Sequence, residues 1–189
     1  MDTSRNTKQI LCIGDMCVDI FASPLARLPS PGELSLTDEI AVYPGGNALN
    51  TAIALRRLGV PAAIAGSVGD DAFGGLLLNQ LLSLGLDTRG VRREPNSRTA
   101  TTFILRAESE DRRFIHALGV AADFTGEHVS ADLLPKNGIV LVGGYLKLGA
   151  WNDEVLTNLL EQAHQRNCCN VLNVCIAKDS GVDPSRAVR

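Results

Sequence analysis

A glycine pair with nearby side-chain amides is the part of this sequence best suited to chemistry. The run Gly45-Gly46-Asn47-Ala48-Leu49-Asn50 opens a stretch whose apolar residues have helical spacing and which ends at Gly59. Glycines at a loop-to-helix junction let the backbone approach a ligand closely. Asn50 can donate and accept hydrogen bonds, which suits a hydroxyl group that does both. We therefore predict a binding loop at residues 45–50, although Asn50 could instead bond its own backbone.

Two carboxylates precede this loop. The apolar run at residues 10–13 suits a buried strand, and Asp15 and Asp19 follow its C-terminal end, where such strands deliver side chains to a site. Asp19 can accept two hydroxyl protons, or it can simply close a turn. His116 stands alone in an apolar strand and is expected to be a satisfied core or lid histidine rather than a catalyst.

Other site chemistries find little support. No Gly-x-Gly-x-x-Gly follows a predicted strand with an acid about twenty residues later, and no P-loop sequence occurs. Gly143-Gly144 is the nearest candidate and is interpreted as a strand-end bend. The five cysteines lack the C-x-x-C spacing of zinc or redox sites, so we expect no metal site and interpret them as small core residues.

Composition narrows the class of protein. The 189 residues are 45% hydrophobic and 21% charged, which is enough apolar material for one folded domain. The formal net charge of -3 offers no basic field for nucleic acid. The polar start and the break at Gly14-Asp15 leave no signal peptide or membrane span, so a cytoplasmic protein without membrane or nucleic-acid partners is expected.

The elements needed to position these residues follow an α/β pattern. Glycine-terminated helices alternate with apolar strands, which is typical of a parallel sheet. Two stretches of β character interrupt it at about 22–43 and 88–117; they are predicted to pair with each other as a small lid, with a hairpin around residues 108–112 and alternation at 34–37. The predicted helices are residues 47–58, 72–84 and 152–165, and the predicted strands of the main sheet are 10–13, 62–68, 139–142 and 170–174.

The motifs resemble a known family. Gly45 to Ala52 with Gly59 and Gly69, the upstream Gly14-Asp15-Met16-Cys17-Val18-Asp19, and the downstream Val68-Gly69-Asp70-Asp71 resemble the N-terminal part of ribokinase-like (PfkB) carbohydrate kinases. The resemblance covers residues 10–179 and leaves 180–189 as a polar tail. It implies a three-layer, Rossmann-like α/β fold with a mostly parallel sheet and a small β lid.

The resemblance also implies a function. Asp19, Gly45, Gly46 and Asn50 would hold a sugar, and Asp15 and Asn47 would line the same pocket. The full-length protein would phosphorylate a sugar hydroxyl with ATP and Mg²⁺, and two lids would clasp into a homodimer.

The family's later motifs, Asn-x-x-Glu and Gly-x-Gly-Asp, do not occur in these 189 residues. The catalytic base is therefore expected beyond residue 189, and the chain alone is expected to be inactive. Cys17 and Asn47 stand where ribokinase has Asn and Lys, so a hexose, a ketose, a sugar acid or a nucleoside stays open as substrate. The alternatives are a noncatalytic sugar-binding or dimerisation module and a nucleoside kinase.

Overall fold

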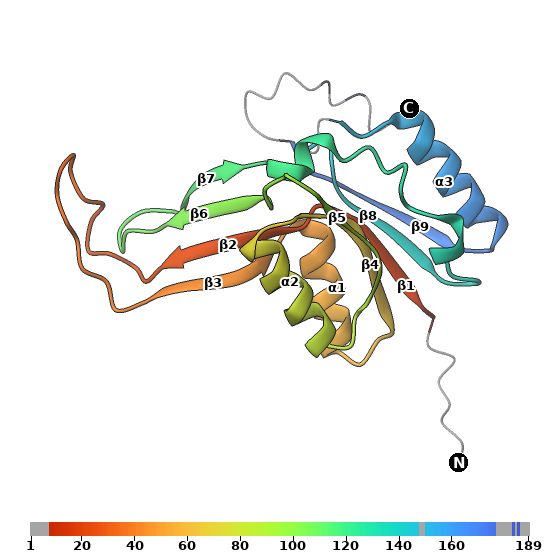
Figure 1. Cartoon of the computed structure of the whole chain (residues 1–189), viewed down its shortest axis with the longest axis horizontal. Coiled ribbons are helices and arrows are strands. Elements are labelled where there is room, and N and C mark those ends of the chain that lie inside the picture. Colours follow the sequence, from red (N-terminus) through yellow and green to blue (C-terminus); the bar gives the residue numbers. More distant parts are fainter. Residues whose placement is uncertain (1–7, 148–149, 177–182, 184, 186–189) are drawn as a thin grey trace, which may run out of the picture.

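Two sheets organise the chain (Figure 1). The computed structural model describes residues 8–147, 150–176, 183 and 185, so most of the expected tail at 180–189 lies outside the described residues. The larger sheet has the order β5-β4-β1-β8-β9, and every pairing in it is parallel. Its strands are β1 (Ile10–Gly14), β4 (Ala62–Gly69), β5 (Asp87–Glu94), β8 (Ile139–Tyr145) and β9 (Cys169–Val174).

Helices cover both faces of this sheet, as the alternation of side chains along its strands requires. From β1, Cys12 points into a core shared with α1 (Asn47–Arg57) and α2 (Ala72–Ser83). Its neighbours Leu11 and Ile13 point into the opposite core, shared with α3 (Asp153–Gln165). The predicted three-layer α/β fold is confirmed, and the three predicted helices begin and end within about one residue of their expected bounds.

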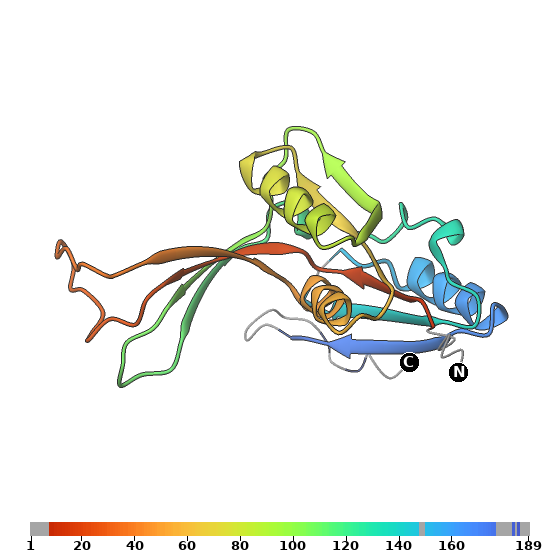
Figure 2. The ribbon, with the colours of Figure 1, turned by 90° about the horizontal axis from the view of Figure 1, so that it is seen from below.

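The smaller sheet is the lid, which extends away from the body (Figures 1 and 2). Its order is β3-β2-β6-β7, formed by β2 (Cys17–Ala22), β3 (Ile40–Gly45), β6 (Thr101–Leu105) and β7 (Arg113–Ala117). The predicted hairpin is present as β6 and β7. The predicted pairing of this hairpin with the 22–43 stretch was wrong. Strand β6 pairs in parallel with β2, and β3 pairs only with the other side of β2.

The lid boundaries therefore differ from the expected 22–43 and 88–117. Residues 87–94 form β5, an edge strand of the larger sheet, so the second lid segment begins at Thr101. The first begins at Cys17. Residues 34–37 form no strand despite their alternation, and Leu34 and Leu36 are more than four-fifths exposed. Alternation without a partner strand does not make a strand, because the backbone groups need hydrogen bonds.

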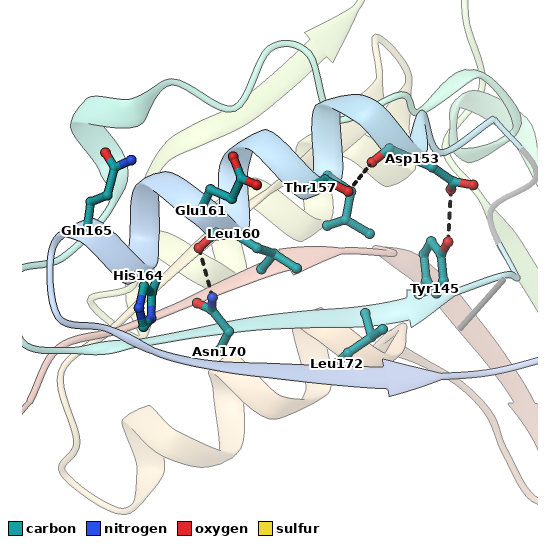
Figure 3. Close-up of a pocket in the computed structure, with 10 residues that line it drawn as sticks. Tyr145, Asp153, Thr157, Leu160, Glu161, His164, Gln165, Asn170 and Leu172 are labelled. Atoms are coloured by element: carbon teal, nitrogen blue, oxygen red, sulfur yellow. Dashed lines mark hydrogen bonds between the residues drawn. The ribbon is translucent and has the colours of Figure 1, made fainter. Parts of the chain in front are cut away.

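The other edge of the larger sheet is β9, every residue of which is exposed. A groove of about 760 Å³ runs between β9 and α3 (Figure 3). Leu160 and Leu172 contribute apolar surface to it, and the Asn170 side chain donates to the Leu160 carbonyl across it at 2.8 Å. The final strand of the described sheet is thus covered on neither its edge nor this part of its face.

Candidate sugar-binding site

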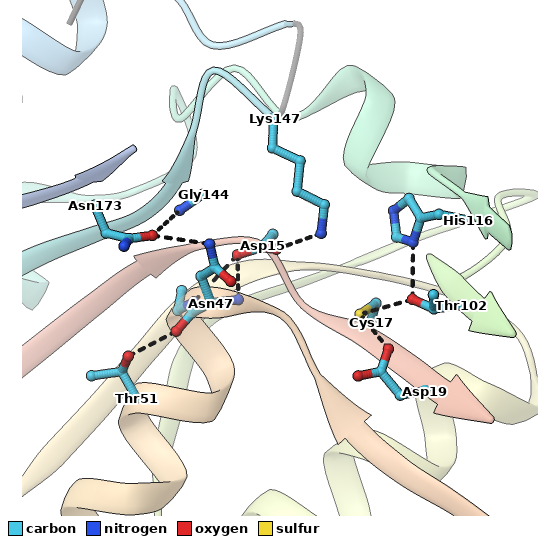
Figure 4. Close-up of polar contacts among 11 residues, drawn as sticks. Asp15, Cys17, Asp19, Asn47, Thr51, Thr102, His116, Gly144, Lys147 and Asn173 are labelled. Atoms are coloured by element: carbon cyan, nitrogen blue, oxygen red, sulfur yellow. Dashed lines mark hydrogen bonds and ion pairs between the residues drawn. The ribbon is translucent and has the colours of Figure 1, made fainter. Parts of the chain in front are cut away.

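Polar side chains gather where the lid joins the larger sheet. The C-terminal ends of β1 and β8 are adjacent, with Gly14 in register with Gly143, so the residues that follow them meet at one place. The lid strands β2, β6 and β7 contribute the remaining side chains (Figure 4). We call this group the lid junction and define it as Asp15, Cys17, Asp19, Thr102, His116 and Lys147.

Asp15 is the buried centre of the lid junction, with 3% of its surface exposed. Its Oδ1 accepts the backbone N–H groups of Asn47 at 2.7 Å and Ala48 at 3.2 Å, the first residues of α1. Its Oδ2 accepts a hydrogen bond from the Lys147 ammonium group at 2.9 Å. Asp15 thus caps α1 with a carboxylate, which the helix dipole also favours.

The glycine loop is shaped around the two aspartates. Gly46 has φ +99°, a backbone angle that side-chain-bearing residues avoid, and it passes close to the Asp15 backbone. A Cβ on Gly45 would lie 2.6 Å from Asp19 Oδ1, and one on Gly144 would lie 2.7 Å from Asp15 Oδ1. Larger residues at these positions would therefore displace the carboxylates.

Asp19 lies on β2 on the same face of the lid as Thr102, with which it is in register. Its Oδ1 accepts a weak hydrogen bond from the Cys17 thiol at 3.4 Å, and Oδ2 has no hydrogen-bond partner among the described residues. Burial, followed by the nearby charge of Asp19, raises the pKa of Cys17 to about 12, so Cys17 remains a thiol. Asp19 keeps one carboxylate oxygen available to a ligand.

His116 faces the same group from β7. Its Nδ1 lies 3.0 Å from the Thr102 hydroxyl. Burial and then the charge of Lys147 lower the pKa of His116, against the opposing effects of Asp15 and Asp19. The ring is therefore neutral at neutral pH, and the Thr102 hydroxyl gives it a hydrogen-bond partner.

Asn47 and Asn50 lie on the other side of Asp15. The Asn47 side chain donates to Asn173 Oδ1 at 2.9 Å, and the Gly144 N–H also lies 3.3 Å from that oxygen. Asn50 is exposed and has no side-chain hydrogen bond within the described chain. With Asn47 and Asn173 it lines a separate hollow of about 460 Å³, so no contact in the described structure joins it to Asp19.

The sequence pattern missed Lys147, Thr102 and Asn173. A signal for Lys147 and Asn173 was present, because both lie close to the C-terminal ends of parallel strands, the edge at which Asp15 also lies. Thr102 required knowledge of the β2–β6 pairing. The cysteines divide differently from the expectation: Cys12, Cys17 and Cys168 are buried, whereas Cys169 is exposed and Cys175 is intermediate, and all are free thiols.

In the described residues, no group of three or more His, Cys, Asp or Glu side chains is placed to hold a metal ion. No helix in the same part of the chain is both long and apolar enough to cross a bilayer.

Comparison with known proteins identifies the family. The model of the pfkB family carbohydrate kinase matches residues 7–184, and the chain belongs to that family. It is 31% identical to the probable chloroplastic fructokinase-6 of Arabidopsis thaliana over 132 residues, which are 69% of this chain and 33% of that protein.

Solved structures share the fold. The Xylella fastidiosa fructokinase with bound ATP has a TM-score of 0.76 at 23% identity over 95% of this chain and 57% of that one. A putative ribokinase II from E. coli has a TM-score of 0.77 at 21% identity, covering 96% and 58%. The chain thus spans about a third of the matched curated fructokinase and somewhat more than half of these solved structures.

Proposed function

We propose that this chain supplies the sugar-holding half of an ATP-dependent sugar kinase. The observation that carries the proposal is Asp19, one carboxylate oxygen of which has no hydrogen-bond partner among the described residues and lies beside the glycine loop. A carboxylate in this position accepts hydrogen bonds from sugar hydroxyls. Gly45 and Gly46 are proposed as further sugar contacts, and Asp15 and Asn47 as residues that line and position the site; Asn50 is left out because it lines the separate hollow.

The phosphate and metal sites are proposed to lie in the part of the fold that this chain does not include. A phosphate group binds well at a free helix N-terminus. Here side chains already occupy the N-termini of all three described α-helices: Asp15 at α1, Asp71 at α2 and Asn152 at α3. The described residues therefore do not fit ATP and Mg²⁺, and we derive no catalytic step from them.

The test is sugar-dependent ADP formation by the full-length protein with Mg²⁺ and ATP. D-fructose is the first probe because fructokinases are among the similar proteins, followed by D-ribose, D-glucose and D-gluconate. Asp19→Ala is expected to weaken sugar binding by about 10-fold or more in calorimetry, since a hydrogen bond to a charged group contributes about 1.5 to 3 kcal/mol. Asp111→Ala, at an exposed lid turn, is the matched control. Unchanged affinity in a folded Asp19→Ala protein contradicts the assignment.

A noncatalytic sugar-binding module is the second candidate, and the side-chain caps on the N-termini of the three described α-helices favour it. The same assay separates the two functions. Sugar binding without any sugar-dependent ADP formation by the full-length protein favours the module.

A further inference from the structure

The turn after β8 is strained in a way that directs one side chain. Leu146 is a buried non-glycine residue with φ +70°, in the left-handed region that costs such residues roughly 1 to 2 kcal/mol. The Lys147 N–H donates to the Gly144 carbonyl at 3.0 Å and closes the turn. This geometry brings the Lys147 side chain into the lid junction (Figure 4). Strain of this kind persists where the surrounding structure enforces it, often at functional sites.

Lys147 is anchored at one point and has donors to spare. Its ammonium group has three N–H donors, and Asp15 Oδ2 accepts one of them at 2.9 Å. The Lys147 side chain makes no other hydrogen bond within the described residues. Burial acts to lower its pKa, but the charge and hydrogen bond of Asp15 outweigh it, so the pKa is raised and Lys147 is charged at neutral pH.

The charges around Lys147 indicate what it can bind. Asp15 and Lys147 neutralise each other, and His116 is neutral at neutral pH. The Asp19 carboxylate therefore gives the lid junction one excess negative charge. A sugar carrying a carboxylate or phosphate would face that charge, whereas a neutral sugar could offer hydroxyl protons to Asp19 and an acceptor oxygen to Lys147.

We propose that Lys147 is a specificity-determining residue of the sugar site, which donates a hydrogen bond to one oxygen of a neutral sugar whose hydroxyls are held by Asp19. This inference rests on the proposed sugar-kinase function and adds to it a residue and a substrate class. The anchoring by Asp15 fixes the ammonium group before the sugar arrives, so the contact selects sugars with an oxygen at that position.

The experiment is calorimetric titration of the full-length protein and its Lys147→Met variant. Of D-fructose, D-ribose and D-glucose, the sugar that binds the unaltered protein most tightly is compared with its monodeoxy analogues. Lys147→Met is expected to reduce the affinity for the parent sugar by about 10-fold or more. Lys136→Met, at an exposed position, is the matched control and is expected to leave the affinity within about two-fold.

The analogues separate direct contact from indirect positioning. If Lys147 donates a hydrogen bond to one sugar oxygen, the analogue lacking that oxygen binds weakly to the unaltered protein. Lys147→Met then causes no further loss of affinity for that analogue. Equal weakening of every analogue by the substitution would mean that Lys147 only positions Asp15, and would overturn the proposal. If Lys147→Met does not fold, the Lys147→Met/Asp15→Asn variant replaces it, because it leaves no unpaired charge.

D-gluconate tests the substrate class. The unaltered protein is expected to bind it at least about 10-fold more weakly than the best neutral sugar, since a like charge opposes it at Asp19. Tight D-gluconate binding that disappears in Lys147→Met would overturn the neutral-sugar assignment. If none of the probes binds the unaltered protein, the proposed function itself fails. If a neutral sugar binds but Lys147→Met weakens the binding of the sugar and of all its analogues equally, or of none, only this inference fails.

Discussion

The Cα of Gly45 lies so close to the carboxylate of Asp19 that no side chain fits between them. The two residues belong to adjacent lid strands, where Gly45 pairs with Cys17, two positions before Asp19. A Cβ at Gly45 would overlap the Asp19 carboxyl group, including Oδ1 at 2.6 Å. The glycine therefore determines where the Asp19 carboxylate, the proposed sugar ligand, can lie.

Gly45→Ala is expected to reduce sugar affinity of the full-length protein by about 10-fold or more, because Asp19 must move away from its bonding position. Calorimetry measures the affinity, and circular dichroism checks the fold. Gly75→Ala is the matched control, because a Cβ there meets nothing within 4 Å. It lies within α2 and is expected to stabilise the protein by up to about 1 kcal/mol without changing sugar affinity. Normal sugar affinity in Gly45→Ala would contradict the proposed role of Asp19.

Substitution of Asp15 is expected to reduce stability, because protein donors already bond its carboxylate. Asp15→Ala leaves two N–H groups of α1 and the Lys147 charge without their partner. Loss of one member of a buried ion pair destabilises proteins by about 3 to 5 kcal/mol, so we expect a loss near the lower figure because Lys147 is partly exposed.

Asp15→Asn is the informative comparison. Its amide oxygen can still accept the α1 N–H groups, so it should destabilise less than Asp15→Ala in urea unfolding. Equal losses in the two variants would mean that the α1 cap contributes nothing measurable. A loss below about 1 kcal/mol in both would contradict the structural role of Asp15.

Asp15 could be predicted as a site residue from the local sequence, whereas Lys147 could not. The glycine loop and both aspartates were found because their spacing is local, within residues 14–50. Lys147 lies 132 residues from Asp15, and only the parallel pairing of β1 with β8 brings them together. Likewise, helix ends marked by Gly59 and Gly85 were predictable, whereas the β2–β6 pairing depends on long-range backbone hydrogen bonds that no local pattern encodes.

Asp71 should make stability depend on pH. It accepts hydrogen bonds from the Gly74 N–H at 2.9 Å and from the N–H and hydroxyl of Thr99, and so joins α2 to the start of the lid. Burial acts to raise its pKa, but these bonds outweigh it and lower the pKa below 3.8. A carboxylate with a lowered pKa in the folded state stabilises the protein above the unfolded-state pKa, and the contribution is lost as pH falls through the folded-state value.

Asp71→Asn is therefore expected to cost about 1 kcal/mol of unfolding free energy at pH 7, a difference that shrinks as pH falls below 3.8. Urea unfolding over a pH series measures it. Asp111→Asn, at an exposed lid turn, should show no such convergence. A difference for Asp71→Asn that is constant with pH would contradict the assignment.

The lid is predicted to pair with a second copy of itself. On the face that carries Asp19, Tyr43 and Phe114 are about half exposed and adjoin a hollow of about 560 Å³ lined partly by Phe21 and Ile104. A thin sheet with this much apolar surface needs a partner to bury it. Phe114→Asp should shift a homodimer to monomer in light scattering, whereas Leu58→Asp, which replaces an exposed leucine after α1, should not. An unaltered full-length protein that is monomeric at micromolar concentration would refute this prediction.

The exposed β9 edge leads to the last prediction, that the 189-residue chain by itself associates and does not turn over. Val171 and Leu172 point to opposite faces of β9 and are 40% and 38% exposed, and no strand among the described residues pairs with the outer edge of β9. Such an edge is a template for pairing with other chains. Val171→Lys should reduce the association seen by light scattering, while Leu82→Lys, at an exposed position on α2, should leave it unchanged. With ATP, Mg²⁺ and the sugar panel, this chain should form no ADP above background, because side chains already cap the N-termini of the α-helices in the described residues. Clear sugar-dependent turnover by the 189 residues would overturn this prediction and require a catalytic base within the described chain.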